Sequence, residues 1–199
     1  RLYAMAIGYD WLYADLSPAE RTTVRDKIVA FYDALEDTVA SDNYVSGPSR
    51  WANVVALAGT TAIHGDDARL DQALEGVLAN WRDGYNPALE AIGDGGGHHM
   101  GWMYGPAYSG PEAYTMWRTA SEDGETWVPD FLRDAPYFHL YAANGDYRVP
   151  MVEDCFNNRF FPGAVNQIAL ASGRFDNAHA EAFYRELEAN SPTPLLQPH

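Results

Sequence analysis

Apolar residues recur at helical spacing through most of the chain. After Ser17-Pro18-Ala19-Glu20, the apolar positions Val24, Ile28, Phe31 and Leu35 fall on one face of a helix. Serine, proline and glutamate at these positions favour a helix start, because the serine and glutamate side chains bond to backbone N–H groups that the helix leaves free. The pattern therefore predicts an amphipathic helix that begins after Ser17.

The segment Trp51–His64 has a different pattern, because its core WANVVALAGTTAI is apolar on most faces. A helix of that composition is buried between other helices. Another amphipathic helix is predicted over Asp66–Trp81, whereas Asp83–Tyr108 breaks the rhythm with many glycines and no clear period. Further helices are predicted over Glu112–Ala120, Phe131–Ala143, Ala164–Ala171 and Asn177–Ala189.

Helices joined by short turns predict an all-α fold, and no pair of segments alternates convincingly as β-strands do. The long helices lack heptads, so we expect helical hairpins packed into a partial (α/α) toroid. A length of 199 residues suits one domain, expected over residues 1–190, with residues 191–199 as a tail or linker. The first residue lies inside an expected helix and is not Met, so we expect a piece of a longer protein.

Charge and composition exclude several classes of function. A formal net charge of −15 argues against general nucleic-acid binding, which needs a basic surface for phosphate contacts. No apolar run approaches the roughly 20 residues of a transmembrane helix, so no membrane span is expected. Cys155 is the single cysteine, which excludes an internal disulfide and a cysteine zinc cluster. An anionic ligand would need a locally basic cleft within the acidic surface.

The glycine-rich segment Asp94–Tyr108, DGGGHHMGWMYGPAY, carries the candidate chemistry. Its glycines permit sharp turns and close approach of a ligand, and its histidines and tyrosines suit acid–base work. A phosphate-binding loop is disfavoured, because no lysine follows the glycines and no strand precedes them. A metal site is disfavoured as well, since His98 and His99 are adjacent and lack zinc-ligand spacing.

An Asp-Gly pair, then histidine, then Tyr104 and Tyr108 resembles the catalytic loop of lyases that act on glycosaminoglycans. His99 and Tyr108 have the nine-residue separation of the catalytic pair in chondroitin and hyaluronate lyases. The broader chain resembles the heparinase II/III and alginate-lyase group, where Glu-Gly often stands in place of Met100-Gly101. That likeness covers AIGYDWLYADLSPAER, RWANVVALAG, the DGG loop and FLRDAPYFHLYA.

The resemblance implies a polysaccharide lyase that uses β-elimination, with no cofactor and no metal. Asn53, His99 and Tyr108 are then the expected catalytic residues: Asn53 neutralises the substrate carboxylate, His99 shares that role or acts as base, and Tyr108 protonates the leaving oxygen. The expected substrate-binding residues are Arg50, Trp51, His98, Tyr104 and Arg159. Asn53 could instead cap a helix. His139, among aromatic residues, is expected to be a buried, hydrogen-bonded histidine.

The expected partner is an acidic polysaccharide or oligosaccharide, and the family adds a β-rich domain after the helical one. Export to the periplasm or outside the cell is expected from such a substrate. One rival function is an (α/α)-barrel glycoside hydrolase with Asp94 and either Glu112 or Glu90 as its carboxylates. Another is a helical domain that binds carbohydrate without turnover.

Overall fold

The computed structural model describes residues 1–98, 111–121, 128–150 and 162–190, and within these ranges the fold is all-α with no β-strand. None of the helices in these ranges has the length and hydropathy needed to cross a bilayer. The helices are α1 (Leu2–Leu12), α2 (Pro18–Asp33), α3 (Glu36–Val39), α4 (Gly47–Ala62), α5 (Ala68–Ala79), α6 (Asn86–Ile92), α8 (Pro111–Ala120), α9 (Phe131–Ala142), α10 (Pro162–Phe175) and α11 (Ala178–Asn190). A π-helical segment, η1 (Asn80–Tyr85), joins α5 to α6, and a short 3₁₀ turn, η2 (Asp94–Gly96), follows α6.

The predicted start of α2 is confirmed. The Ser17 hydroxyl accepts the backbone N–H of Glu20 at 3.4 Å, and the Glu20 carboxylate accepts the backbone N–H of Ser17 at 2.9 Å. This reciprocal pair satisfies two backbone donors that the first turn of a helix leaves without partners.

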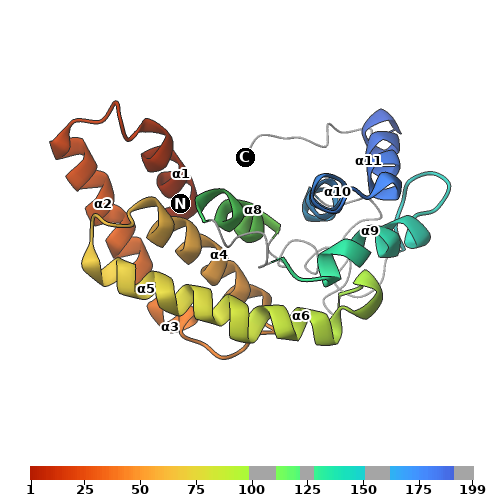
Figure 1. The fold of residues 1–199 in the computed structure, drawn as a ribbon, viewed down its shortest axis with the longest axis horizontal. Helices are drawn as coiled ribbons and strands as arrows, with labels where there is room; N and C mark the ends of the chain where they lie inside the picture. Colours follow the sequence, from red (N-terminus) through yellow and green to blue (C-terminus); the bar gives the residue numbers. More distant parts are fainter. Residues whose placement is uncertain (99–110, 122–127, 151–161, 191–199) are drawn as a thin grey trace.

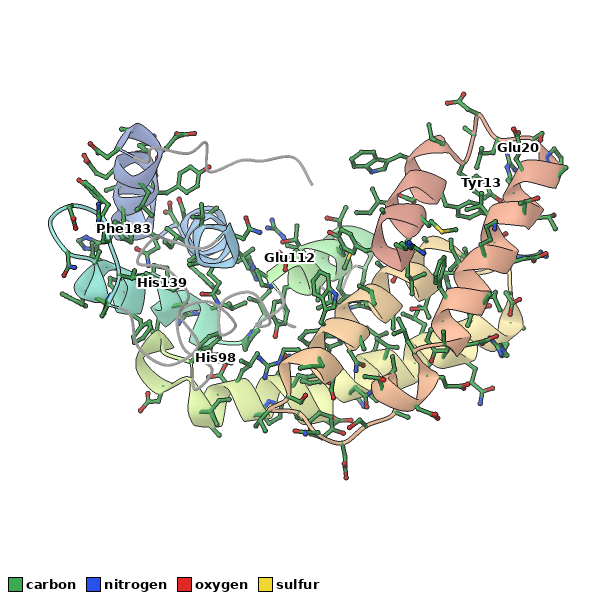
Figure 2. The ribbon with its side chains drawn as sticks, turned by 180° about the vertical axis from the view of Figure 1, so that it is seen from behind. Tyr13, Glu20, His98, Glu112, His139 and Phe183 are labelled. Carbon is green, nitrogen blue, oxygen red and sulfur yellow. The ribbon has the colours of Figure 1, made fainter. Side chains whose placement is uncertain are left out.

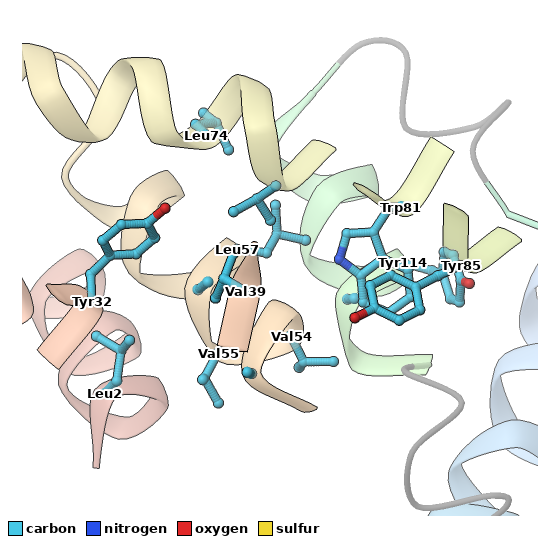
Figure 3. Packing of buried hydrophobic residues seen from close by; sticks show 14 of the residues in the cluster. Leu2, Tyr32, Val39, Val54, Val55, Leu57, Leu74, Trp81, Tyr85 and Tyr114 are labelled. Atoms are coloured by element: carbon cyan, nitrogen blue, oxygen red, sulfur yellow. The ribbon is translucent and has the colours of Figure 1, made fainter. Parts of the chain in front are cut away.

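Helix α4 lies at the centre of the fold, as its apolar composition predicts. It packs against α1, α2, α3, α5 and α8, and the side chains of Val54, Ala56 and Leu57 are fully buried. Figure 3 shows apolar side chains from several helices gathered around it, with Trp81, Tyr85 and Tyr114 grouped at one end. The helix begins at Gly47 rather than at Trp51, because Pro48 occupies a first-turn position where its missing N–H costs nothing.

Helices α1, α4, α8 and α10 contact one another in that order, and the helices between them in sequence lie outside this row (Figure 1). α2 packs on α1, α5 on α4, and α9 and α11 on α10. A second, smaller core joins α10 to α11, with Ile168, Phe183 and Leu187 at its centre. Helices α2, α5, α9 and α11 therefore form an outer layer on α1, α4 and α10.

The expected break at Asp83 is wrong, because the helical run that starts at Ala68 continues to Ile92. In η1 the backbone N–H of Asn86 bonds to the carbonyl of Trp81, five residues back, so one extra residue is taken into the helix. Gly84 does not end the helix. A Cβ on this residue would lie 2.2 Å from the Tyr44 ring, so glycine is needed for that ring to pack here.

Turn η2 leads from α6 toward His98 and is held against α9. Gly95 and Gly96 both have positive φ, 76° and 81°, a region that L-residues with side chains avoid. A Cβ on Gly96 would lie 2.4 Å from the backbone of Asp134 in α9, whereas a Cβ on Gly95 would meet nothing within 4 Å. Gly96 therefore fixes how closely the segment before His98 lies against α9.

This difference makes Gly95 and Gly96 a matched pair for measurement. Gly95→Ala should lower the free energy of unfolding by about 1 kcal/mol, from the positive φ alone. Gly96→Ala should lower it by about 3 kcal/mol, because the methyl group also forces the turn away from α9. Urea unfolding of both variants measures the difference. Equal losses for the two variants would show that η2 is not packed on α9 as described.

His139 confirms its prediction as a buried, hydrogen-bonded histidine. Its side chain is 1% exposed, and its Nε2 lies 2.9 Å from Oε1 of Gln167, which joins α9 to α10. Burial lowers the pKa of His139 to about 4, although the hydrogen bond to Gln167 acts in the opposite direction. The unfolded chain, with an ordinary histidine pKa of about 6.5, therefore binds this proton at higher pH than the folded chain does.

Stability from this site is fully present above about pH 6.5 and is lost as the pH falls toward 4. Between pH 7 and pH 5 the wild type should lose about 2 kcal/mol more unfolding free energy than His139→Gln, which lacks the titrating ring. His179→Gln, at an exposed histidine on α11, should keep the wild-type pH dependence. Urea unfolding at the two pH values tests this, and identical slopes for wild type and His139→Gln would contradict it.

Candidate functional site

The first turns of α4 carry two of the residues that the sequence singles out. Arg50 and Asn53 are three positions apart, so they lie on the same side of the helix. Both side chains are 0% exposed. Buried polar groups are costly unless they are hydrogen-bonded, so the partners of these two residues determine what this end of α4 does.

The Asn53 amide is held by four other residues. Its Nδ2 donates to the carbonyl oxygens of Val39 at 3.3 Å and Ser49 at 3.1 Å, and to the Tyr85 hydroxyl at 3.1 Å. Its Oδ1 accepts a hydrogen bond from Nδ2 of Asn80 at 3.1 Å. Asn53 is the seventh residue of α4, so the alternative that it caps the helix is wrong. It joins α3, α4 and η1 instead.

Arg50 contacts His98, a residue in the described part of the glycine-rich segment. Its Nη1 lies 2.9 Å from Nε2 of His98, and its Nη2 donates to the carbonyl oxygen of Tyr44 at 2.9 Å. A guanidinium has only donors, so Nε2 of His98 must be the acceptor. The ring proton of His98 is therefore on Nδ1, and this contact exists only while the imidazole is neutral. The tautomer of His98 is thus set by Arg50.

An aromatic cluster surrounds these polar groups. The ring of Tyr85 lies between Tyr44 and Trp81, with ring centroids 5.1 Å away in each case, and Trp81 packs edge-on against Tyr114 at 5.4 Å. The Arg50 guanidinium lies 5.6 Å from the centroid of the Tyr85 ring, within the range of a cation–π contact. Guanidinium and aromatic rings therefore form one packed unit.

Burial governs the ionisation of this unit. It raises the pKa of Tyr85 to about 12, against the effects of the Arg50 charge and the Asn53 hydrogen bond. It also raises the pKa of Tyr114, whose hydroxyl donates to Oδ1 of Asn86 at 2.8 Å. Burial lowers the pKa of the Arg50 guanidinium as well. Both phenols are neutral at pH 7, so the charge in this cluster is that of Arg50.

The structure brings together Arg50, Asn53 and His98, three of the residues predicted for the site. Trp51 is adjacent to Arg50 in sequence but lies on another face of α4, where it is 42% exposed and packs against Tyr3 with ring centroids 6.4 Å apart. Its predicted role in substrate binding stays a prediction. The other predicted residues, His99, Tyr104, Tyr108 and Arg159, lie outside the described residues.

Sequence reasoning missed Tyr85, Asn80, Asn86 and Tyr114, which support the Arg50 and Asn53 pair. Three of them belong to η1 or follow it directly, a region that Gly84 and Pro87 made to look like a loop. The sequence signal that could have found them is the set Asn80, Tyr85 and Asn86, polar or hydroxyl-bearing residues that lie close together in sequence. As for metals, no group of three or more His, Cys, Asp or Glu residues in the described ranges is placed to hold one.

Figure 2 shows that His98 and Glu112, one of the carboxylates considered for a hydrolase, lie apart from each other. Glu90, another such carboxylate, accepts the backbone N–H of Phe131 at 3.1 Å, at the first residue of α9. Asp94 is exposed. Glu112, Glu90 and Asp94 therefore each have a different environment in the described part of the chain.

The Asn53 network can be tested by comparing two deletions. Asn53→Ala should lower the free energy of unfolding by about 3 kcal/mol, because it removes hydrogen bonds shared by α3 and η1 and leaves a small cavity. Tyr85→Phe should cost less than about 1 kcal/mol, because the Asn53 amide keeps its two carbonyl acceptors. Chemical denaturation measures both values. A larger loss for Tyr85→Phe than for Asn53→Ala would contradict this order.

Comparison with known proteins leaves the family of the chain open. No family model matches the chain, and no curated protein matches it in sequence. The likeness to polysaccharide lyases therefore depends on the residues quoted from the sequence alone.

Proposed function

We propose that this chain is the helical part of a polysaccharide lyase that cleaves a uronate-containing polysaccharide by β-elimination. The observation that carries the proposal is the contact between Arg50 and His98, 2.9 Å long and 48 residues apart in sequence. It joins the buried helix and the glycine-rich segment, the two regions in which the lyase resemblance places the catalytic residues.

The order of the helices supports the fold that this family implies. In the row α1, α4, α8, α10, an outer helix packs on α1, on α4 and on α10, which resembles the inner-and-outer alternation of helical hairpins in an (α/α) toroid. We therefore propose that these four helices are the inner layer of a partial toroid. The candidate site then lies at the end of that layer where α4 begins.

The reaction needs stabilisation of negative charge. Removal of the proton beside the uronate carboxylate breaks a C–H bond, and its electron pair forms the C4=C5 double bond as the C4–O bond to the leaving sugar breaks. The leaving oxygen takes up a proton. Groups that neutralise the carboxylate lower the barrier, because charge spreads onto it in the transition state.

His98 is suited to that neutralising role. Since its Nε2 accepts from Arg50, its Nδ1 carries the ring proton, and the guanidinium polarises the ring. Arg50 then acts through His98, as a positioning residue. Direct contact of Asn53 with a substrate would require its amide to give up the hydrogen bond to Tyr85. That catalytic role stays a prediction, as do the roles of His99 as base and Tyr108 as proton donor.

The elimination itself can be measured, because only it creates an unsaturated product that absorbs ultraviolet light. The chain should raise the absorbance of at least one of alginate, heparan sulfate, chondroitin and hyaluronan. Tyr108→Phe and His99→Ala should lower kcat at least about a hundredfold, the usual worth of a proton-transfer group. Tyr141→Phe, at an exposed tyrosine on α9, should leave kcat unchanged.

His98→Gln separates positioning from folding, because glutamine can still accept from Arg50 but offers a weaker donor. It should lower kcat about tenfold or more and leave the thermal midpoint nearly unchanged. New reducing ends without ultraviolet absorbance would instead indicate a glycoside hydrolase. Binding without turnover, or no reaction with any of the four polymers, would contradict the lyase proposal.

A further inference from the structure

A cleft of 760 Å³ lies between α1, α4, α8 and α10, away from the aromatic cluster. This volume is within the range of small-molecule sites, which run from about 300 to 1,000 Å³. The cleft is hollow because the helices present small side chains to it. The residues that leave this space are Ala6, Ala58, Ala62, Ala169 and Gly173.

Helix α8 separates the cleft from the Arg50 site. Its residues Glu112, Thr115, Met116 and Thr119 line the cleft and fall on one face at helical spacing. Tyr114 points elsewhere, into the cluster with Trp81. On α4, the cleft is lined near the C-terminal end, whereas Arg50 and Asn53 lie in the first two turns.

Two polar groups of the cleft are buried with unused hydrogen-bonding capacity. Glu112 accepts a hydrogen bond from Nδ2 of Asn166 through Oε1 at 3.0 Å, but its Oε2 is buried and has no hydrogen-bond partner within the described residues. The buried hydroxyl of Thr61 has none there either. An unsatisfied buried oxygen is costly, and a carboxylate oxygen especially so. A ligand that brings hydroxyl donors would remove this cost.

The remaining groups indicate which kind of ligand suits the cleft. Among the described residues that line it, two are acidic, Asp10 and Glu112, and two are basic, Arg118 and Arg174, so the formal charge of this lining is balanced. Trp11 also lines it and is 80% exposed, which leaves an indole face open to a ligand. An aromatic face suits the C–H face of a sugar ring, while carboxylate, amide and guanidinium groups suit its hydroxyls.

We propose that this cleft binds a neutral sugar chain, at a site separate from the one proposed for elimination. Glu112 accepts from sugar hydroxyls at the base of the cleft, Thr61 exchanges a hydrogen bond with the same ring, and Trp11 packs against a ring at its entrance. The site does not depend on the lyase activity, because none of these residues belongs to the Arg50 and His98 contact.

Isothermal titration calorimetry of the chain tests the site directly. The probes are cellohexaose, xylohexaose, mannohexaose and maltohexaose, with hexaguluronate as an acidic probe and spermidine as a cationic one. At least one neutral hexasaccharide should bind with a Kd of about 1 mM or below. Trp11→Ala and Glu112→Gln should each raise that Kd at least about tenfold. Tyr141→Ala removes an equally exposed aromatic residue from α9 and should leave it unchanged.

Thr61→Val gives a second measurement, which distinguishes a hydroxyl that binds the sugar from one with a purely structural role. Valine keeps the shape of threonine and removes the unsatisfied oxygen, so the thermal midpoint of the free chain should stay the same or rise. The Kd for the same hexasaccharide should nevertheless increase. A lower midpoint with an unchanged Kd would contradict the role given to Thr61.

Three outcomes would overturn the proposal. One is the absence of saturable binding by all four neutral hexasaccharides. Another is binding that Trp11→Ala and Glu112→Gln leave unchanged, which would place the sugar elsewhere. The third is binding of only hexaguluronate or only spermidine that depends on Glu112, which would make the cleft a site for charged ligands.

Discussion

The whole arrangement depends on the burial of most of α4. An apolar helix gains free energy in proportion to the area that is removed from water, and five other helices pack against α4 to bury most of its surface. Polar side chains on its buried faces cannot reach solvent and must find partners inside. Arg50 and Asn53 therefore draw α3, η1 and the segment before His98 to the same end of α4. Packing and chemistry are linked here, because the helix that organises the core also carries the charged group of the candidate site.

The acidic character of the chain gives this buried charge a particular importance. A net charge of −15 opposes the approach of an anionic polymer, and the repulsion is weakened by salt. Inside the fold, the Arg50 guanidinium is screened far less than a surface charge, because protein and not water surrounds it. A neutral histidine between this charge and a ligand transmits polarisation without adding a second positive charge. Recognition of a carboxylate by the site would thus depend on local groups and not on the overall field.

Hydrophobic periodicity predicts most of this fold, since the amphipathic pattern of α2 and α5 and the apolar pattern of α4 all lead to the observed helices. It fails at Asp83–Ile92, where Gly84 and Pro87 are ordinary helix breakers. The reason is tertiary: the Tyr44 ring needs the space above Gly84, and the π turn tolerates a proline just after it. Arg50 and His98 were both predicted to bind substrate, but their contact was not predicted, because no spacing rule relates residues 48 positions apart. Tyr85 and Tyr114 were missed, since only packing shows that they enclose Arg50.

The π turn in η1 also determines in which direction the side chains of α6 point. Each residue of an α-helix turns the side chains by about 100°, so the extra residue in η1 rotates everything after it relative to an unbroken helix. With this rotation, Oδ1 of Asn86 accepts the Tyr114 hydroxyl, and the Glu90 carboxylate accepts the first backbone N–H of α9. A chain one residue shorter here would keep its helix and its apolar composition, yet would turn both groups away from their partners. The contacts of α6 with α8 and α9 thus depend on the one extra residue in η1.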